Sequence, residues 1–102
     1  TKMTDIFATI EAQLPREGAS GAVVYCATRN ATERVAAFLK QQGIAAERYH
    51  AGLSADDKRE IQENFRVGHL RVIAATNRDL EAEDDWDIVT DSIEGAADAL
   101  CV

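Results

Sequence analysis

The spacing of apolar residues changes several times along the first half of the chain, and each spacing predicts a different element. In residues 3–14 apolar side chains recur at helical intervals, which predicts an amphipathic helix that ends before Pro15. Residues 21–27 (GAVVYCA) form a short apolar run with β-branched and aromatic members, typical of a strand buried on both faces. A helix is expected next, with Asn30 as N-cap, Glu33 completing a capping-box-like pair, and Gly43 as a left-handed C-terminal glycine.

The second half repeats this alternation. Residues 44–50 (IAAERYH) alternate like a strand near the edge of a sheet, and a helix capped by Ser54 is expected to run to about Val67. A third strand is predicted over residues 70–76, and a fourth, weaker one over 86–91, followed by a short helix within 92–102. Strands that alternate with helices indicate βαβ units, so the expected fold class is α/β with a mostly parallel sheet of about four strands.

Composition narrows the class of protein. A chain of 102 residues is long enough for one small domain, here residues 1–102. No apolar run approaches the roughly 20 residues that span a membrane, and no signal pattern opens the chain, so we expect no membrane partner and a cytoplasmic location, nucleoid-associated in a bacterium. The two cysteines, Cys26 and Cys101, have no partner at metal-ligand spacing, so no metal site is expected and both are interpreted as reduced thiols.

Charge is distributed unevenly along the chain. Residues 1–78 carry 11 Lys and Arg against 9 Asp and Glu, whereas residues 79–102 carry 9 acidic residues and no Lys or Arg. The net charge of −7 therefore belongs to the last quarter. The first three quarters remain suited to a polyanionic partner.

Three small polar segments follow the three predicted parallel strands: CATRN, HAGLS and ATNRD. The carboxyl ends of parallel strands meet at one edge of a sheet, where ligands of open α/β sheets bind. The first two segments lead into helix N-termini, whose backbone N–H groups and partial positive charge favour phosphate. Hydroxyl and amide donors together with arginines in these segments favour a phosphate backbone over an isolated metabolite.

The same segments carry a family resemblance. The resemblance is carried by three motifs in order: VVYCATR, YHAGLS and FRVGHLRVIAATN. With these motifs, residues 21–77 resemble the second RecA-like motor domain of superfamily 2 helicases. Within that superfamily they are most similar to the RecQ family of ATP-dependent DNA helicases. The resemblance implies a three-layer RecA-like sandwich, DNA as the partner, expected to be single-stranded, and a first RecA-like ATP-binding domain in cis or in trans. ATP and Mg²⁺ are implied for an intact helicase, and no cofactor for this chain alone.

The family pattern also nominates residues. Contacts to nucleic-acid phosphates are implied for Thr28 and Arg29 and for Thr76 and Asn77, and His50 matches the loop beneath the strand path. Asp84 aligns with the family's aspartate near the nucleotide sugar, but the glycines that flank that aspartate in the family are missing. No catalytic residue is expected. The chain has no GxxxxGK[S/T] loop and no arginine after Arg78 to act as an arginine finger, so it should not hydrolyse ATP alone.

Alternatives remain open for several of these residues. His50 could pack a turn, contact nucleic acid or position neighbouring loops, and Thr28 with Arg29 could be only a capped helix start with a solvated arginine. The whole chain could be a non-enzymatic interaction module derived from a helicase domain. A weaker alternative is a phosphotransferase with Cys26 as nucleophile, although the arginine such enzymes place six residues later is Thr32 here.

Overall fold

The computed structural model describes residues 2–13, 20–77, 80, 85–92 and 95–96, and in them helices and strands alternate as predicted. The helices are α1 (Lys2–Gln13), α2 (Arg29–Gln41) and α3 (Ala55–Arg66), and the strands are β1 (Ser20–Cys26), β2 (Ala46–Tyr49), β3 (Val72–Thr76) and β4 (Trp86–Ser92). The predicted elements up to β4 are confirmed, with boundaries shifted by one or two residues. Most of the short helix expected within 92–102 lies outside the described residues.

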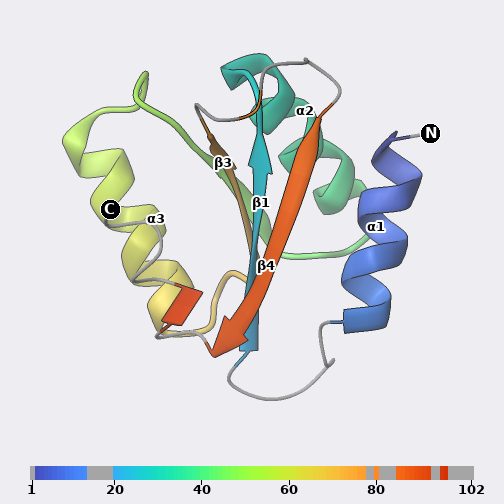
Figure 1. The fold of residues 1–102 in the computed structure, drawn as a ribbon. Helices are drawn as coiled ribbons and strands as arrows, with labels where there is room; N and C mark the ends of the chain where they lie inside the picture. The colour runs from blue at the N-terminus through green and yellow to red at the C-terminus, as the bar shows by residue number, and fades with distance from the viewer. Residues whose placement is uncertain (1, 14–19, 78–79, 81–84, 93–94, 97–102) are drawn as a thin grey trace.

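The four strands form one sheet in the order β2-β3-β1-β4. Strands β1 and β2 both pair in parallel with β3, whereas β4 pairs antiparallel with β1 (Figure 1). A parallel pair needs a crossover of a dozen or more residues, and only nine separate Thr76 from Trp86. The chain therefore turns back after β3, and the mostly parallel sheet ends in an antiparallel edge strand.

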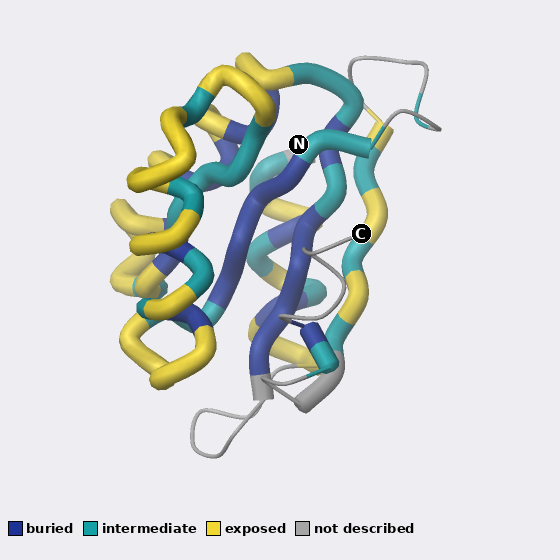
Figure 2. Tube along the Cα trace, turned by 90° about the vertical axis from the view of Figure 1, so that its left-hand side faces the viewer, coloured by how far each residue is buried: buried dark blue, intermediate teal, exposed yellow. Residues whose placement is uncertain are grey.

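Helices cover both faces of this sheet, which makes the predicted three-layer sandwich (Figure 1). Helices α1 and α2 pack on one face, where Ile6 and Leu39 join Val24 in a buried cluster. Helix α3 packs on the other face, where Phe65 joins Val23 and other strand residues. Neighbouring residues of a strand point to opposite faces, so Val23 and Val24 are both completely buried. Figure 2 shows this burial concentrated in the central strands, with exposed residues on the outer turns of the helices.

A glycine lets α3 approach the sheet closely. A Cβ atom placed on Gly21 of β1 would lie 2.7 Å from Cζ of Phe65 and 2.8 Å from its Cε1, closer than real Cβ contacts. Because Gly21 has no side chain, the Phe65 ring packs directly against the backbone of β1. At the end of α2, Gly43 has φ +84°, and Gly43 and Ile44 donate their N–H groups to the carbonyls of Lys40 and Leu39, as in a Schellman motif.

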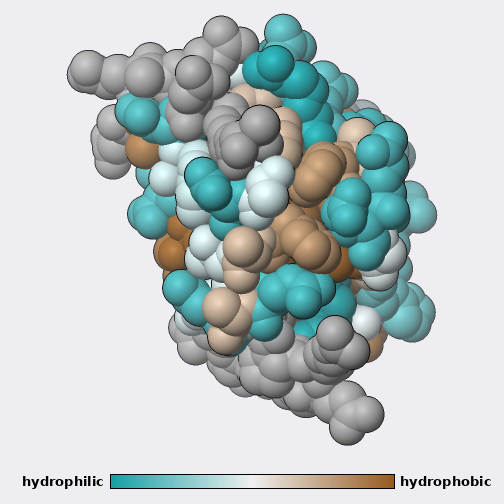
Figure 3. Space-filling view, turned by 90° about the vertical axis from the view of Figure 1, so that its right-hand side faces the viewer, coloured by the Kyte–Doolittle hydropathy of each residue, from teal (hydrophilic) through white to brown (hydrophobic). Residues whose placement is uncertain are grey.

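The face formed by α1 and β4 keeps apolar side chains near its surface. Met3, Phe7 and Ile88 are only partly buried where they pack against the core, and Figure 3 shows apolar side chains gathered on this face among hydrophilic ones. Among the described residues, no helix has the length and apolar character that crossing a membrane requires.

Candidate nucleic-acid interface

The carboxyl ends of the three parallel strands lie at the same edge of the sheet. Cys26 is in register with Thr76, and Tyr49 of β2 is in register with Ala75 of β3. Beyond the strands, the N–H of Asn77 donates to the carbonyl of Cys26 at 2.9 Å, so the segments that follow β1 and β3 stay side by side. The three polar segments that the sequence singled out are thus brought to one edge.

The first segment shows how α2 begins, and it corrects one expectation. Thr28, rather than Asn30, is the N-cap: its backbone is extended, and its hydroxyl accepts the N–H of Ala31 at 3.1 Å. Strand β1 ends at Cys26, which leaves only two residues before the helix. Thr28 is therefore the residue directly before the first helical turn, where its hydroxyl can accept a free backbone N–H group. The earlier cap places Arg29 in the first turn of α2 with an exposed side chain.

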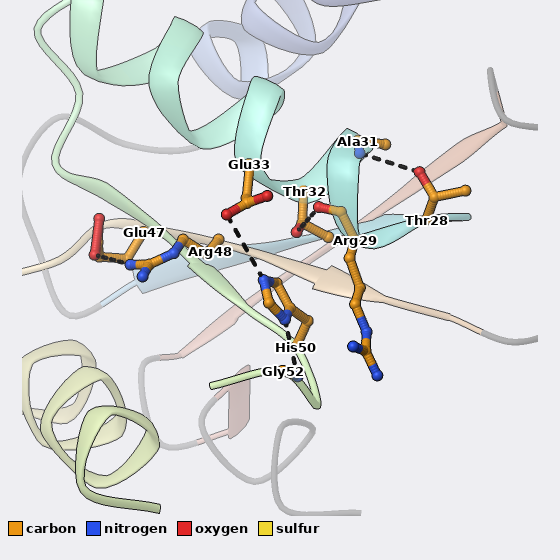
Figure 4. A network of polar contacts seen from close by, with 9 residues as sticks. All are labelled: Thr28, Arg29, Ala31, Thr32, Glu33, Glu47, Arg48, His50 and Gly52. Atoms are coloured by element: carbon orange, nitrogen blue, oxygen red, sulfur yellow. Dashed lines mark hydrogen bonds and ion pairs between the residues drawn. The ribbon is translucent and has the colours of Figure 1, made fainter. Parts of the chain in front are cut away.

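The second segment is a turn organised by His50 (Figure 4). The N–H of Gly52 donates to Nδ1 of His50 at 3.0 Å, and the N–H of Leu53 donates to the carbonyl of His50 at 3.1 Å. The predicted cap of the next helix is confirmed, because the hydroxyl of Ser54 accepts the N–H of Asp57 at 3.1 Å. The His50 side chain is only 9% exposed, and its Nε2 lies 4.0 Å from Oε1 of Glu33 on α2.

The first two segments meet although their strands are not neighbours. Strand β3 lies between β1 and β2, yet Nη1 of Arg29 is 3.2 Å from the position that a Cβ on Gly52 would occupy. The same Cβ would lie 2.9 Å from Cε1 of His50. The missing side chain at Gly52 therefore makes room for the imidazole and the guanidinium together, as Figure 4 shows.

The third segment contributes Thr76 and Asn77, both half-buried at the end of β3. Their backbone position beside Cys26 places them next to the start of the first segment. Arg78 and the nucleotide-contact candidate Asp84 lie outside the described residues. The structure thus places five of the six nominated residues, Thr28, Arg29, His50, Thr76 and Asn77, at one edge of the sheet. Their contacts to nucleic acid remain predictions.

Acidic side chains mark one side of this edge. Strand β4 begins beside the end of β1, because Trp86 is in register with Cys26, and the flanking Asp85 and Asp87 are exposed. Carboxylates there repel a phosphate chain, so an anion that followed this edge would stay on the side of β1 that faces β3 and β2. In the described part of the chain, no group of three or more His, Cys, Asp or Glu is placed to hold a metal ion.

Two further residues bear on the expectations from the sequence: Glu33 takes a place that its sequence context did not suggest, whereas Cys26 is a buried thiol, in agreement with its preferred interpretation. The sequence predicts Glu33 as a capping partner for Asn30, but in the structure its carboxylate faces the imidazole of His50. No pattern within one segment signals this contact, since it joins α2 to the loop after β2. Cys26 is completely buried, and its thiol lies 3.9 Å from the carbonyl of Val24. A nucleophile must reach its substrate, so burial of this thiol argues against a phosphotransferase that uses Cys26.

Comparison with known proteins gives a consistent picture. Residues 5–78 match the family described as "Helicase conserved C-terminal domain". The chain is 36% identical over 63 residues to the ATP-dependent DNA helicase RecQ of Pasteurella multocida, a match that covers 62% of this chain and 10% of that protein. It is 43% identical over 54 residues to the ATP-dependent DNA helicase Q5 of Mus musculus, covering 53% of this chain and 6% of the relative. The predicted RecQ-like resemblance is confirmed, and the family match extends through most of α1.

A solved structure supports the fold. Helicase Lhr of Mycobacterium smegmatis, described as bound to single-stranded DNA and AMP-PNP, aligns with 72% of this chain and 10% of its own, with a TM-score of 0.53 and 22% identity. At this identity the likeness concerns the fold alone, and it agrees with the RecA-like sandwich. The chain spans about a tenth or less of the length of these proteins.

Proposed function

The chain belongs to the helicase conserved C-terminal domain family, and we propose that it acts as the second motor domain of a RecQ-like ATP-dependent DNA helicase by holding the DNA backbone. One observation carries the proposal. The segments after three parallel strands converge on one edge, where exposed Arg29 lies against the turn at Gly52. A backbone grip needs donors and positive charge that do not read sequence, and this edge offers both.

The side chains and backbone groups at this edge could bind successive phosphates of a DNA backbone. The N-terminus of α2 offers backbone N–H groups and a partial positive charge, and Arg29 in its first turn adds a full charge. Thr76 and Asn77 add polar side chains beside it. Asp85 and Asp87 border the edge on the β4 side, so the DNA strand would cross the ends of β1, β3 and β2. The solved Lhr relative is described as bound to single-stranded DNA, which supports a single-stranded partner.

The motor would need a second domain. The sequence contains no GxxxxGK[S/T] loop, so ATP and Mg²⁺ would be held chiefly by a first RecA-like domain, in cis or in trans. This chain would then supply the DNA grip, and ATP turnover at the cleft between the domains would move that grip along the strand. Alone, the chain should not hydrolyse ATP.

Binding of a fluorescent single-stranded oligonucleotide, followed by anisotropy at several salt concentrations, tests the grip. We expect weak binding that falls steeply with salt, since each phosphate contact on a single strand adds about 0.7 to the slope of log K against log salt. Arg29→Ala should remove about one such contact and weaken binding about threefold to tenfold. Arg66→Ala is the matched control, because Arg66 is an exposed arginine at the far end of α3.

Two results would contradict the proposal. One is no binding by the unmodified chain at low salt, and the other is an equal effect of the two arginine substitutions. The first result would favour the alternative function, a non-enzymatic interaction module. That alternative draws support from the apolar side chains on the α1 and β4 face, and it would be identified by a protein partner that binds without DNA.

A further inference from the structure

We propose that Glu33 is a positioning residue for the DNA-holding edge: its carboxylate accepts the Nε2–H of His50, and His50 in turn holds the turn at Gly52 against Arg29. Two segments are involved: α2 carries both Glu33 and Arg29, and the loop after β2 carries His50 and Gly52 (Figure 4). The inference rests on the proposed function for its DNA-binding consequence. Its structural consequence stands without DNA.

The hydrogen bond to Gly52 fixes the tautomer of His50. Nδ1 accepts the N–H of Gly52 at 3.0 Å, so Nδ1 carries no proton in this arrangement. A neutral imidazole with an unprotonated Nδ1 carries its proton on Nε2 and donates from there. Nε2–H therefore needs an acceptor on the opposite side of the ring.

The structure leaves this donor without a hydrogen bond. Nε2 of His50 is buried and makes no hydrogen bond in the described part of the chain, and a buried unsatisfied donor is costly. Oε1 of Glu33 is the acceptor it faces, at 4.0 Å. The Glu33 side chain is 54% exposed, so we expect a change of its rotamer to close the gap by about 1 Å to hydrogen-bond distance.

The same geometry separates positioning from direct contact. Both ring nitrogens of His50 face protein groups, Gly52 on one side and Glu33 on the other, and the ring is 9% exposed. A phosphate that approached Nε2 would meet the carboxylate of Glu33 and be repelled. Arg48, two residues before His50, is paired with Glu47 at 3.1 Å. His50 is thus arranged to act on DNA through the turn and Arg29.

Substitutions at Glu33 test the proposal by the sign of their effect on DNA affinity. If Glu33 mattered only as a negative charge beside the phosphate path, Glu33→Ala and Glu33→Gln would both tighten binding. Positioning predicts that Glu33→Ala weakens binding of a single-stranded oligonucleotide about threefold to tenfold, the effect of one lost hydrogen bond. Glu33→Gln keeps an acceptor for Nε2–H and should restore most of that loss. Glu63→Ala, which removes an exposed charge from α3, is the matched control for charge alone.

A second substitution examines the other half of the contact. In His50→Asn the side-chain oxygen can still accept the N–H of Gly52, as in an Asx turn. The amide N–H of the shorter side chain lies nearer the backbone than Nε2 of the imidazole, so we expect it not to reach Glu33. Adding Glu33→Ala to His50→Asn should then cause no further weakening. If Glu33→Ala tightens binding, or weakens it equally in both backgrounds, the positioning role is wrong. If His50→Asn alone abolishes binding while Glu33→Ala leaves it unchanged, His50 contacts DNA directly and the proposal also fails.

Nuclear magnetic resonance of the unbound chain keeps the inference testable if DNA binding fails. We expect the ¹⁵N shifts of His50 to report the Nε2–H tautomer, and Glu33→Ala to speed amide exchange of Gly52 severalfold while Glu33→Gln changes it little. Equal exchange rates in all three proteins would refute the positioning role. Loss of DNA binding with the expected exchange pattern would instead refute only the proposed function.

Discussion

Replacing Gly21 by alanine sets two physical effects of opposite sign against each other. Gly21 lies in β1 and is buried, and the described glycines with positive φ are Gly43 and Gly68, so its backbone is one that alanine adopts without strain. Through the unfolded chain alone, a compatible Gly→Ala change stabilises a protein by about 0.4–1 kcal/mol. The added Cβ would however lie 2.7 Å from Cζ of Phe65, which is completely buried.

The steric clash with Phe65 should outweigh the entropic stabilisation. To reach the lower limit of ordinary contact, about 3.4 Å, the ring must retreat by roughly 0.7 Å. Phe65 packs against Val23 and Ile73 in the cluster under α3, so the ring has no open space to enter. Overpacking of this kind costs about 1–3 kcal/mol, and after the opposing entropy term we expect a net loss of about 1–2 kcal/mol. For a domain of this size that lowers Tm by roughly 5–15 °C.

Chemical denaturation measures this loss. The only tryptophan, Trp86, packs against the core from β4, so its fluorescence and far-ultraviolet circular dichroism give two probes of unfolding whose coincidence supports a two-state analysis. Phe65→Leu removes the two ring atoms that the new methyl group meets. The double variant Gly21→Ala/Phe65→Leu should therefore lose less stability than the two single losses combined, by at least about 0.5 kcal/mol. A stabilised Gly21→Ala protein, or strictly additive losses, would refute the packing argument.

The remaining predictions concern the edge of the sheet. Thr28→Ala and Ser54→Ala each remove a helix N-cap and should each lower the free energy of unfolding by about 1 kcal/mol, but only Thr28→Ala should also weaken binding to single-stranded DNA, as anisotropy would show. Equal effects on binding would mean that the start of α2 is not a phosphate contact. Gly52→Ala places a methyl group against His50 and Arg29 and should weaken DNA binding with a stability change of about 1 kcal/mol or less. Gly43 has φ +84° and nothing within 4 Å of an added Cβ, so Gly43→Ala should reduce stability by about 1 kcal/mol and leave DNA binding intact. Weaker DNA binding in Gly43→Ala but not in Gly52→Ala would contradict the role of the turn at Gly52.

Local patterns predicted the elements well because they depend on neighbours within one or two turns. The apolar runs of β1 and β3, the cap at Ser54 and the left-handed Gly43 can each be recognised from a few adjacent residues. The wrong N-cap at Asn30 shows the limit of this approach. Thr28 and Asn30 are both residue types that cap helices, and they lie within three residues of each other. Thr28 is the N-cap because β1 ends at Cys26, and the end of β1 depends on strand pairing in the sheet.

The sequence by itself determined an α/β chain, a sheet edge rich in small polar residues, and membership of a helicase-like family through three ordered motifs. Tertiary structure alone decided which of those residues meet. Strand β3 inserts between β1 and β2, yet α2 crosses over and brings Arg29 to Gly52 and Glu33 to His50. It also turned β4 antiparallel, which set Asp85 and Asp87 at the border of the edge. Such contacts join residues far apart in sequence, and their free energy depends on the packing of the whole sheet, so no short pattern encodes them.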